Sequence, residues 1–452
     1  MTAGIGRRGF TATALSALLL VAAAAAVPSG ALGSSKPGAK PIPQSSCFWT
    51  DQVASKFSTD PAKNYAFPDT GAVYWSSNLA IPPGATVVLK GKYAHARYQS
   101  INSYRSSDNT PIDAVNDVST VPDVGSRNPY VTGARRDTGG AVRHYTLKIV
   151  NEPPPAVSPP NTLFAGVTGQ DRQQLLYRVY LPDHYSAKEA TGGVGLPKAN
   201  LRLADGTVLK GQAACDALAI QPGPLNVLKL GSAAYNAIRH PGGESPTFPA
   251  TNPTNWDAFY SIPYVLQCSY EGNCGGTPAR TGGQYSNIDN QYTYAFGNRG
   301  FADGPVWVLH GKLPTTPQTG PKVKRMPAGD LRYWSICQNE SIFTTRGAGC
   351  LYDKQVPTDK DGMYTIVTST AADRPDNAHR KCGVGFIPWP AAGDGAGNTD
   401  DSFLILRNML PSPQFDHAVQ DTQVPGDEEQ VMGDYLPTGS YETTAQFEKR
   451  GC

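Results

Sequence analysis

Short apolar runs separated by turn residues are the dominant pattern along this chain of 452 residues. The runs are rich in Val, Ile, Leu and Tyr, and Gly, Pro, Asn or Asp stand between them, as at Pro82-Pro83-Gly84 and Asp303-Gly304-Pro305. Such runs predict β-strands joined by tight turns, and helical periodicity is hard to find in them. We therefore expect a mainly β protein built from antiparallel sandwich-like or jelly-roll-like units.

The same strand pattern occurs twice. Residues 331–337 read LRYWSIC and residues 96–102 read ARYQSIN, so Arg, Tyr, Ser and Ile recur in one order and spacing. A second pair of runs, 176–182 and 405–411, shares Arg, Leu and Pro. Two matches in the same order predict an internal duplication, with a small mixed α/β insertion between the copies.

The pattern also predicts where each part of the chain begins and ends. In the insertion we expect a hairpin over 201–209 and short helices over 212–218 and 225–238. The predicted parts are a signal peptide (1–33), a leader (34–65), a first β unit (66–184), the insertion (185–283), a second β unit (284–415) and a C-terminal tail (416–452).

The first residues have the features of an export signal. Arg7 and Arg8 precede an apolar run over 12–27, and Ala24-Ala25-Ala26 offers a cleavage site. The arginine pair also fits a twin-arginine signal, so both export routes stay open. The run is short and Ala-rich for a membrane span, and no later run is long enough. We expect a secreted or extracytoplasmic protein with no transmembrane segment in its mature chain.

The chain has eight cysteines, an even number behind an export signal, which predicts four disulfides. Local spacing favours Cys268–Cys274 and Cys337–Cys350, and pairing Cys47 with Cys452 would tie the termini together. The connectivity is otherwise open. No C-x-x-C pair occurs, so we expect no metal site. The predicted disulfide cysteines are Cys47, Cys215, Cys268, Cys274, Cys337, Cys350, Cys382 and Cys452.

Charge argues against one class of partner. Lys and Arg number 39 and Asp and Glu number 37, so the chain lacks the surplus of positive charge by which proteins bind nucleic acid. An extracellular small molecule or a polysaccharide is the partner that we expect, and the sequence leaves the oligomeric state open.

The repeated arginines have two interpretations. With nearby tryptophans they could form an anion or sugar site, because guanidinium groups bind bidentately and indole rings stack. Alternatively, each arginine is held inside its own unit by a carboxylate such as Asp113, Asp117 or Asp353. A residue present in both copies favours this structural role. The candidate ligand-binding residues are Arg97, Tyr98, Arg332, Tyr333, Trp334, Trp75, Asp353, His95 and His310.

No catalytic motif is found. The sequence has no G-x-S-x-G elbow, no H-E-x-x-H, no P-loop and no dinucleotide fingerprint, and it predicts no cofactor. Asp353, Asp359 and Asp361 could form a carboxylate pair for glycoside chemistry, but they stand in turn-like sequence where Asp is common. The catalytic residues, if there are any, stay unidentified.

Several of these runs resemble a bacterial family. Tyr333-Trp334-Ser335, residues 351–353, Asp361-Gly362 and residues 403–407 resemble the twelve-fourteen domain of unknown function. The first unit more loosely resembles its frequent partner, the twelve-fifty-four domain, through residues 69–75 and Arg97-Tyr98. The resemblance covers most of residues 66–415 and implies paired β domains in an exported protein. It implies no catalytic residues, and the cysteines and the long insertion depart from it.

Three functions fit the sequence. The first is a binding or envelope-associated protein that performs no chemistry. The second is a secreted hydrolase or lyase that acts on an extracellular carbohydrate or polymer in a cleft between the units. The third is an enzyme that depends on a cofactor or a metal.

Overall fold

The computed structural model describes residues 45–53, 63–107, 109–184, 189–223, 230–240, 242–276, 278, 280 and 289–452. These residues belong to one compact unit, 42–452. The predicted signal peptide and most of the predicted leader lie outside the described residues, as does part of the helix expected over 225–238. Among the residues described, no helix has the length and apolar character needed to cross a membrane.

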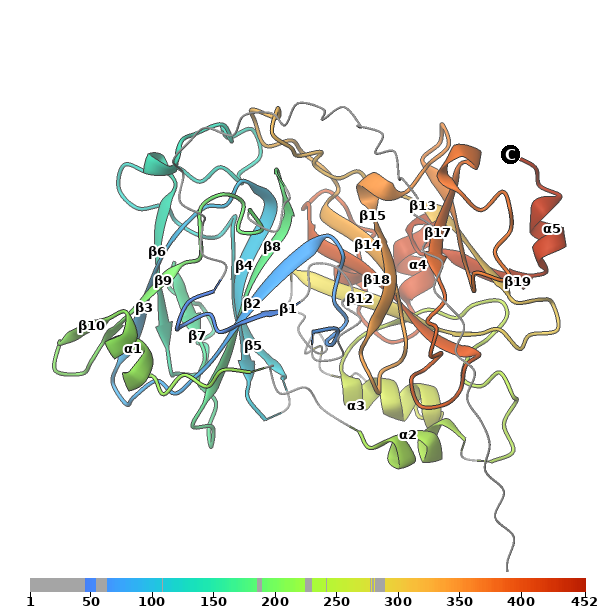
Figure 1. The fold of residues 1–452 in the computed structure, drawn as a ribbon, viewed down its shortest axis with the longest axis horizontal. Coiled ribbons are helices and arrows are strands. Elements are labelled where there is room, and N and C mark those ends of the chain that lie inside the picture. The colour runs from blue at the N-terminus through green and yellow to red at the C-terminus, as the bar shows by residue number, and fades with distance from the viewer. Residues whose placement is uncertain are drawn as a thin grey trace, which may run out of the picture. The chain divides into compact units, whose positions relative to one another are not determined.

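Two equivalent sets of seven strands form the body of the fold, and Figure 1 shows both. The first set is β2 (Ala72–Leu79), β3 (Thr86–Lys92), β4 (Ala96–Arg105), β5 (Pro111–Asn116), β6 (His144–Val150), β7 (Thr162–Phe164) and β8 (Gln173–Pro182). The second set is β12 (Asn290–Asn298), β13 (Val306–Lys312), β14 (Leu331–Asn339), β15 (Gly347–Tyr352), β16 (Met363–Ser369), β17 (Val384–Pro388) and β18 (Asp401–Pro411).

Both sets have the same topology. In the first set β2-β8-β4-β5 form one sheet and β3-β6-β7 another, and in the second set β12-β18-β14-β15 and β13-β16-β17 do the same. Even the exceptions match, because β6 and β7 are parallel, as are β16 and β17, while the other described strand pairs are antiparallel. The predicted fold class, mainly β with two duplicated sandwich-like units, is therefore confirmed.

The register places the repeated arginines at equivalent positions. Arg178 of β8 lies opposite Ser100 of β4, and Arg407 of β18 lies opposite Ser335 of β14. The ladder between each pair of strands is also interrupted at the same place, where Leu181 or Leu410 adopts a φ of 45°. The residues opposite this interruption on the facing strands are Arg97 and Arg332.

Other segments extend these sheets. The predicted hairpin over 201–209 is present as β9 (Lys198–Arg202) and β10 (Val208–Lys210), and β9 pairs with β3. In the second unit β19 (Thr438–Glu442) pairs with β13. At the edges, β1 (Asp51–Val53) pairs with β2 and β11 (Asp257–Ala258) with β12.

The helices of the described residues are short. They are α1 (Gln212–Ala217), α2 (Ser232–Arg239), α3 (Ile262–Val265), α4 (Glu428–Met432) and α5 (Thr444–Glu448). The position of α1 confirms the helix expected over 212–218.

Each sandwich has an apolar core between its two sheets. Trp75, Leu89 and Tyr177 belong to the first core, and Trp307, Trp334 and Leu406 belong to the second. The central strands are buried on their other face as well, where tyrosines of the two units meet. This third cluster joins the units and includes Tyr74, Tyr98, Tyr180, Tyr333 and Met409.

Four disulfides are formed, and no cysteine is free. They confirm the expected number and the two local pairs, Cys268–Cys274 and Cys337–Cys350. The suggested pairing of Cys47 with Cys452 is wrong. Cys47 stands just before β1, beside α1, and bonds to Cys215 of that helix, whereas Cys452 follows α5 and bonds to Cys382. Each end of the described chain is thus fixed to its own unit.

Candidate functional site

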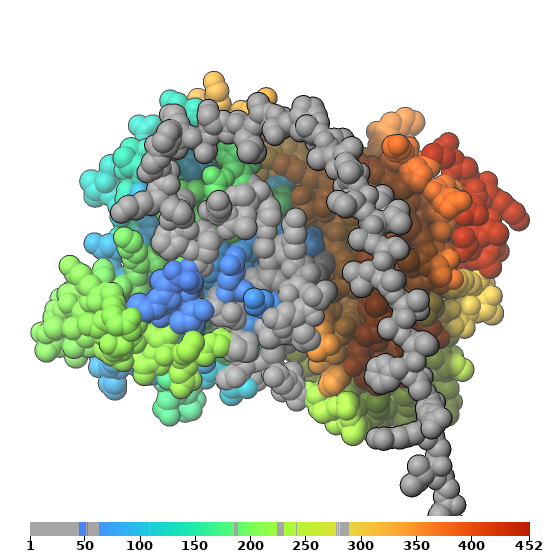
Figure 2. All heavy atoms as spheres, in the orientation of Figure 1, coloured from blue at the N-terminus to red at the C-terminus, as the bar shows by residue number. Residues whose placement is uncertain are grey.

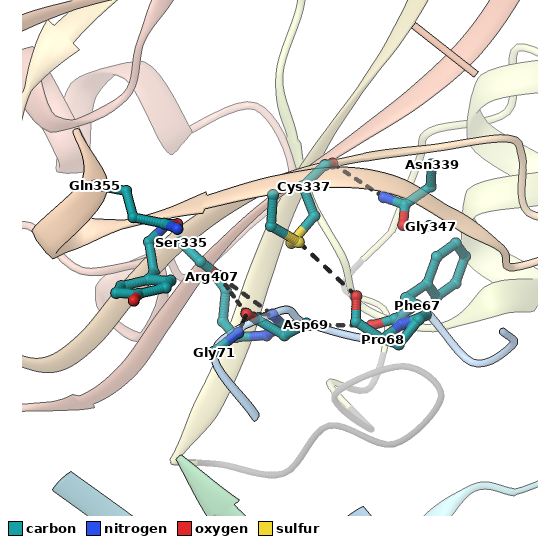
Figure 3. Close-up of a disulfide and its surroundings, with 12 residues drawn as sticks. Phe67, Pro68, Asp69, Gly71, Ser335, Cys337, Asn339, Gly347, Gln355 and Arg407 are labelled. Atoms are coloured by element: carbon teal, nitrogen blue, oxygen red, sulfur yellow. Dashed lines mark hydrogen bonds and ion pairs between the residues drawn. A yellow bond between two sulfur atoms is a disulfide. The ribbon is translucent and has the colours of Figure 1, made fainter. Parts of the chain in front are cut away.

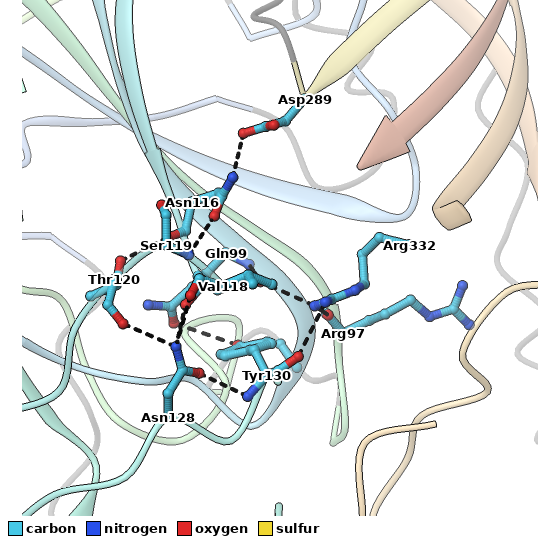
Figure 4. Close-up of polar contacts among 12 residues, drawn as sticks. Arg97, Gln99, Asn116, Val118, Ser119, Thr120, Asn128, Tyr130, Asp289 and Arg332 are labelled. Atoms are coloured by element: carbon cyan, nitrogen blue, oxygen red, sulfur yellow. Dashed lines mark hydrogen bonds and ion pairs between the residues drawn. The ribbon is translucent and has the colours of Figure 1, made fainter. Parts of the chain in front are cut away.

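The arginines of the first repeat cross from one unit to the other. Arg97 is fully buried, and its Nη1 lies 2.5 Å from Oδ2 of Asp353, in the second unit. Arg332 does the reverse, because its Nη1 lies 3.3 Å from Oδ1 of Asp117, in the first unit. Arg332 also donates to the carbonyl oxygens of Arg97 and Tyr130, as Figure 4 shows.

The two acids are equivalent as well. Asp117 is the residue after β5, and Asp353 is the residue after β15, the matching strand. The interpretation that each arginine is held inside its own unit is therefore wrong, although Asp117 and Asp353 are among the carboxylates that were expected. A buried guanidinium needs a carboxylate, and here the two units supply each other's.

A second pair of arginines lies deeper between the units. Arg407 pairs with Asp69 of the first unit (Figure 3). The carboxylate of Asp69 also accepts hydrogen bonds from Ser335 Oγ and Tyr333 OH, each at 2.6 Å. Its equivalent, Arg178, donates from Nε to Ser100 Oγ at 3.0 Å. This group of contacts fixes the tyrosine-rich faces of the two central sheets against each other.

Asp289 of the second unit lies close to Arg178. Burial raises the pKa of its carboxyl, while a hydrogen bond from Asn116 and the charge of Arg178 lower it. Asn116 Nδ2 lies 2.5 Å from Asp289 Oδ2, which adds another contact from the first unit to the second (Figure 4). Contacts of this kind therefore run in both directions across the boundary.

Asp117 is the most perturbed of the acids. Burial raises the pKa of its carboxyl to about 7, although the charge of Arg332 and a hydrogen bond from the backbone of Gln99 both act to lower it. A carboxyl with such a pKa could exchange a proton near neutral pH. Asp117 is fully buried, however, and it does not belong to the cavity that Arg178 and Arg407 line.

The expected aromatic platforms lie inside the protein. Trp75 and Trp334 have no exposed surface, since Trp75 stacks on Tyr177 and Trp334 packs beside Tyr364. Tyr98 and Tyr333 are equally buried, and both lie against the ring of Tyr180. These residues meet at the boundary or in the cores, and none of them presents a stacking surface to solvent.

The two candidate histidines lie apart from this group. His95 is partly buried, and burial together with the charge of Arg143 lowers its pKa to about 4. His310 is exposed on β13, and its Nδ1 lies 3.4 Å from Thr365 Oγ1. Among the described residues, no hydrogen bond or ion pair joins either histidine to Arg97 or Arg332.

A small cavity lies between the two units, beside the second arginine pair. The space open to the centre of a water molecule is about 20 Å³. Arg178 and Arg407 both line it, together with four tyrosines, Tyr65, Tyr74, Tyr180 and Tyr292. Ala66 and Phe67 form another part of its wall and have positive φ values of 63° and 50°, a strained backbone that the surrounding structure must hold in place.

Some hydrogen-bond donors in the wall of this cavity have no acceptor among the described residues. Arg407 Nε is buried and has no hydrogen-bond partner among the described residues. The hydroxyl oxygens of Tyr74 and Tyr180 lie 3.2 Å apart, so one phenol donates to the other and one phenolic hydrogen remains. Arg178 and Arg407 recur in the repeated runs 176–182 and 405–411, and this recurrence is the signal by which the sequence could have identified them as site residues, although they were not among the predicted candidates.

Two clusters have the composition of metal sites. They are His379 with Cys382 and Cys452, and Asp69 with Cys337 and Cys350. In both clusters the two cysteines are joined in a disulfide, so neither offers the thiolate that binds a metal. One possible ligand remains in each cluster, which is too few for a site.

No family model matches the chain, and no curated protein matches it. Among solved structures, the chain is similar to an uncharacterised protein of Burkholderia cenocepacia, with 10% identity, a TM-score of 0.45 and coverage of 86% of this chain and 81% of that one. It is also similar to the VPA0106 protein of Vibrio parahaemolyticus, with 10% identity, a TM-score of 0.36 and coverage of 80% and 90%. At these TM-scores neither likeness bears on function.

Proposed function

We propose that this chain is an exported binding protein that holds a small, oxygen-rich extracellular or envelope ligand in the cavity between its units and performs no chemistry on it. The four disulfides fit an extracytoplasmic protein, because such bonds persist in oxidising compartments. The single observation that carries the binding site is the excess of donors around the cavity. Arg407 Nε and one phenolic hydrogen of the Tyr74–Tyr180 pair would both be satisfied by the oxygens of a ligand.

The size of the cavity limits what could enter it. A space of about 20 Å³ for water centres accommodates a carboxylate or a hydroxyl group, not a polymer chain. The ligand would therefore place one polar end between Arg407 and the tyrosines. A sugar acid or a small organic acid has such an end.

Most glycoside hydrolases need two carboxyl groups beside the substrate, one to donate a proton and one to act as base or nucleophile. Asp69, Asp117 and Asp353 are each paired with an arginine, and none of the three lines the cavity. This arrangement favours binding over the enzymatic alternative.

Thermal melts with glucuronate, citrate and glucose test the proposal. We expect glucuronate or citrate to raise Tm, since a ligand at a hundred times its Kd adds about 2.7 kcal/mol to the free energy of unfolding. Tyr180→Phe should lose this rise, because it removes a hydroxyl at the cavity. Tyr145→Phe is the matched control, since Tyr145 lies in the core of the first sandwich, away from the cavity. An equal rise in both variants, or no rise in the parent with any probe, would contradict the proposal.

A further inference from the structure

One face of the first unit is covered with positive charge. The sheet β10-β9-β3-β6-β7 has its inner face in the core, and its outer face is exposed. None of its five strands contains Asp or Glu, although the carboxylate of Asp123, from a neighbouring loop, accepts a hydrogen bond from Thr146 of β6. The exposed cations on these strands are Lys90, Lys148, Lys198, Arg202 and Lys210.

The register shows that these cations share one face. Lys90 of β3 lies directly opposite Lys198 of β9, and Lys210 of β10 lies opposite Asn200, two residues along β9. Asn200 in turn lies opposite Val88, which is also opposite Lys148 of β6. Residues directly opposite each other in a sheet project to the same side. The alternating residues of β3 and β6, such as Leu89 and Leu147, are buried in the core.

This arrangement is unfavourable for the fold alone. Like charges directly opposite each other destabilise a sheet, and Lys90 and Lys198 are such a pair. Among the described residues, none of the five cations forms an ion pair. Lysine is common on edge strands as a guard against aggregation, but β3 and β6 each have a neighbour on both sides. The β10 edge, with α1, lies at the surface in green at the left of Figure 2.

The equivalent face of the second unit is apolar rather than positively charged. There the outward residues of β13 and β16 include Val306, Val308 and Val367, and Phe447 of α5 packs on them. The chain itself therefore covers that face. The duplicated sheets have diverged, and the cationic face of the first unit lacks such a helix among the described residues.

We propose that this face binds a linear polyanion, a glycan or other polymer that carries carboxylate or phosphate groups at regular intervals. Neighbouring strands lie about 4.8 Å apart and alternate residues about 6.7 Å apart, so the cations form a flat array that an extended chain of anions can follow. None of the outward residues of β3, β6, β9 and β10 is Trp, Tyr or Phe, and Phe164 of β7, on the same side, is only 6% exposed. The face therefore has no stacking platform for neutral sugars and no aromatic anchor for a membrane. This site is separate from the cavity and does not rest on it.

Affinity electrophoresis with soluble polymers tests this inference. The probes are alginate, which carries carboxylates, polyphosphate, which carries phosphates, and neutral dextran. We expect the parent to bind one or both anionic polymers, more weakly as salt rises, and not to bind dextran. Which of the two it binds identifies the anionic group.

Two triple variants test whether binding depends on where the positive charge lies or only on the total charge of the protein. Lys90→Gln, Lys148→Gln and Lys198→Gln together should weaken binding at least tenfold. Lys322→Gln, Lys324→Gln and Lys449→Gln remove the same charge from exposed sites elsewhere and should weaken it less than twofold. Thermal melts of both variants check that each is folded. Equal losses in the two variants, no binding of either polymer by the parent, or binding only to anionic vesicles or DNA would overturn the inference.

Discussion

Arg97 and Arg332 stand at equivalent positions of two strands, and each reaches the carboxylate that follows the other unit's matching strand. The sequence predicted that these arginines would be buried beside acids, and it included both acids among the candidates. It could not predict that the pairs would cross between units. Whether the ion pairs form within a unit or between units depends on how the two sandwiches pack. No local sequence pattern in either copy predicts that packing.

Removal of these arginines should destabilise the protein strongly. Arg97→Ala and Arg332→Ala each leave a buried carboxylate without its partner, which costs about 3–5 kcal/mol of the free energy of unfolding. Arg202→Ala, on an exposed strand, is the control and should change it by less than about 0.5 kcal/mol. Urea denaturation measures all three. Parent-like midpoints for the two buried variants would mean that the pairs are not structural.

The pKa of Asp117 predicts a pH dependence. In the folded protein this pKa is about 7, against an ordinary value of 3.8. Between these values the folded state holds more protons than the unfolded chain, so the free energy of unfolding should fall as pH rises from 4 to 7. Asp117→Asn should lose this contribution, whereas Asp216→Asn, at an exposed acid, should keep it. Urea melts across this pH range measure the slope, and an unchanged slope in Asp117→Asn would contradict the assignment.

At the scale of elements, the pattern of apolar runs and turn residues predicted where the strands lie. It did not predict which sheet each strand joins. The hairpin over 201–209 and the helix at 212–218 are where the sequence predicted them. Neither position shows that β9 extends the sheet of β3, or that β19, near the end of the chain, pairs with β13. Such pairings join residues more than a hundred positions apart, and only the closed sandwich specifies them.

The helix α5 has a structural role that can be tested. Its Phe447 is 1% exposed and covers Val306, Val308 and Val367 on the outer face of the second unit. Phe447→Ala should cost about 3–5 kcal/mol, the usual range for truncating a buried Phe. Lys449→Ala, just after the helix and exposed, should leave stability unchanged. Both are measured by urea denaturation, and a loss below 1 kcal/mol would show that this face needs no cover.

At the scale of the whole molecule, the duplication has produced a boundary that is buried like a core. Tyrosines from both central sheets, two crossed ion pairs and the Arg407–Asp69 pair all lie there. The enzymatic alternative drawn from the sequence placed a substrate in a cleft between the units. Among the described residues the structure has instead a tightly packed boundary, with a small cavity beside Arg178 and Arg407. The repeated short motifs identified the two units. They could not predict how the units pack together, because the side chains that join the units belong to different copies.

Scanning calorimetry tests most directly whether the repeated arginines join the two units. The parent should unfold in one transition, with equal calorimetric and van't Hoff enthalpies, because neither unit can leave the other without exposing buried charges. The double variant Arg97→Ala, Arg332→Ala should unfold at lower temperature and in two transitions, one for each unit. Two separate transitions in the parent, or a double variant that unfolds like the parent, would contradict the account.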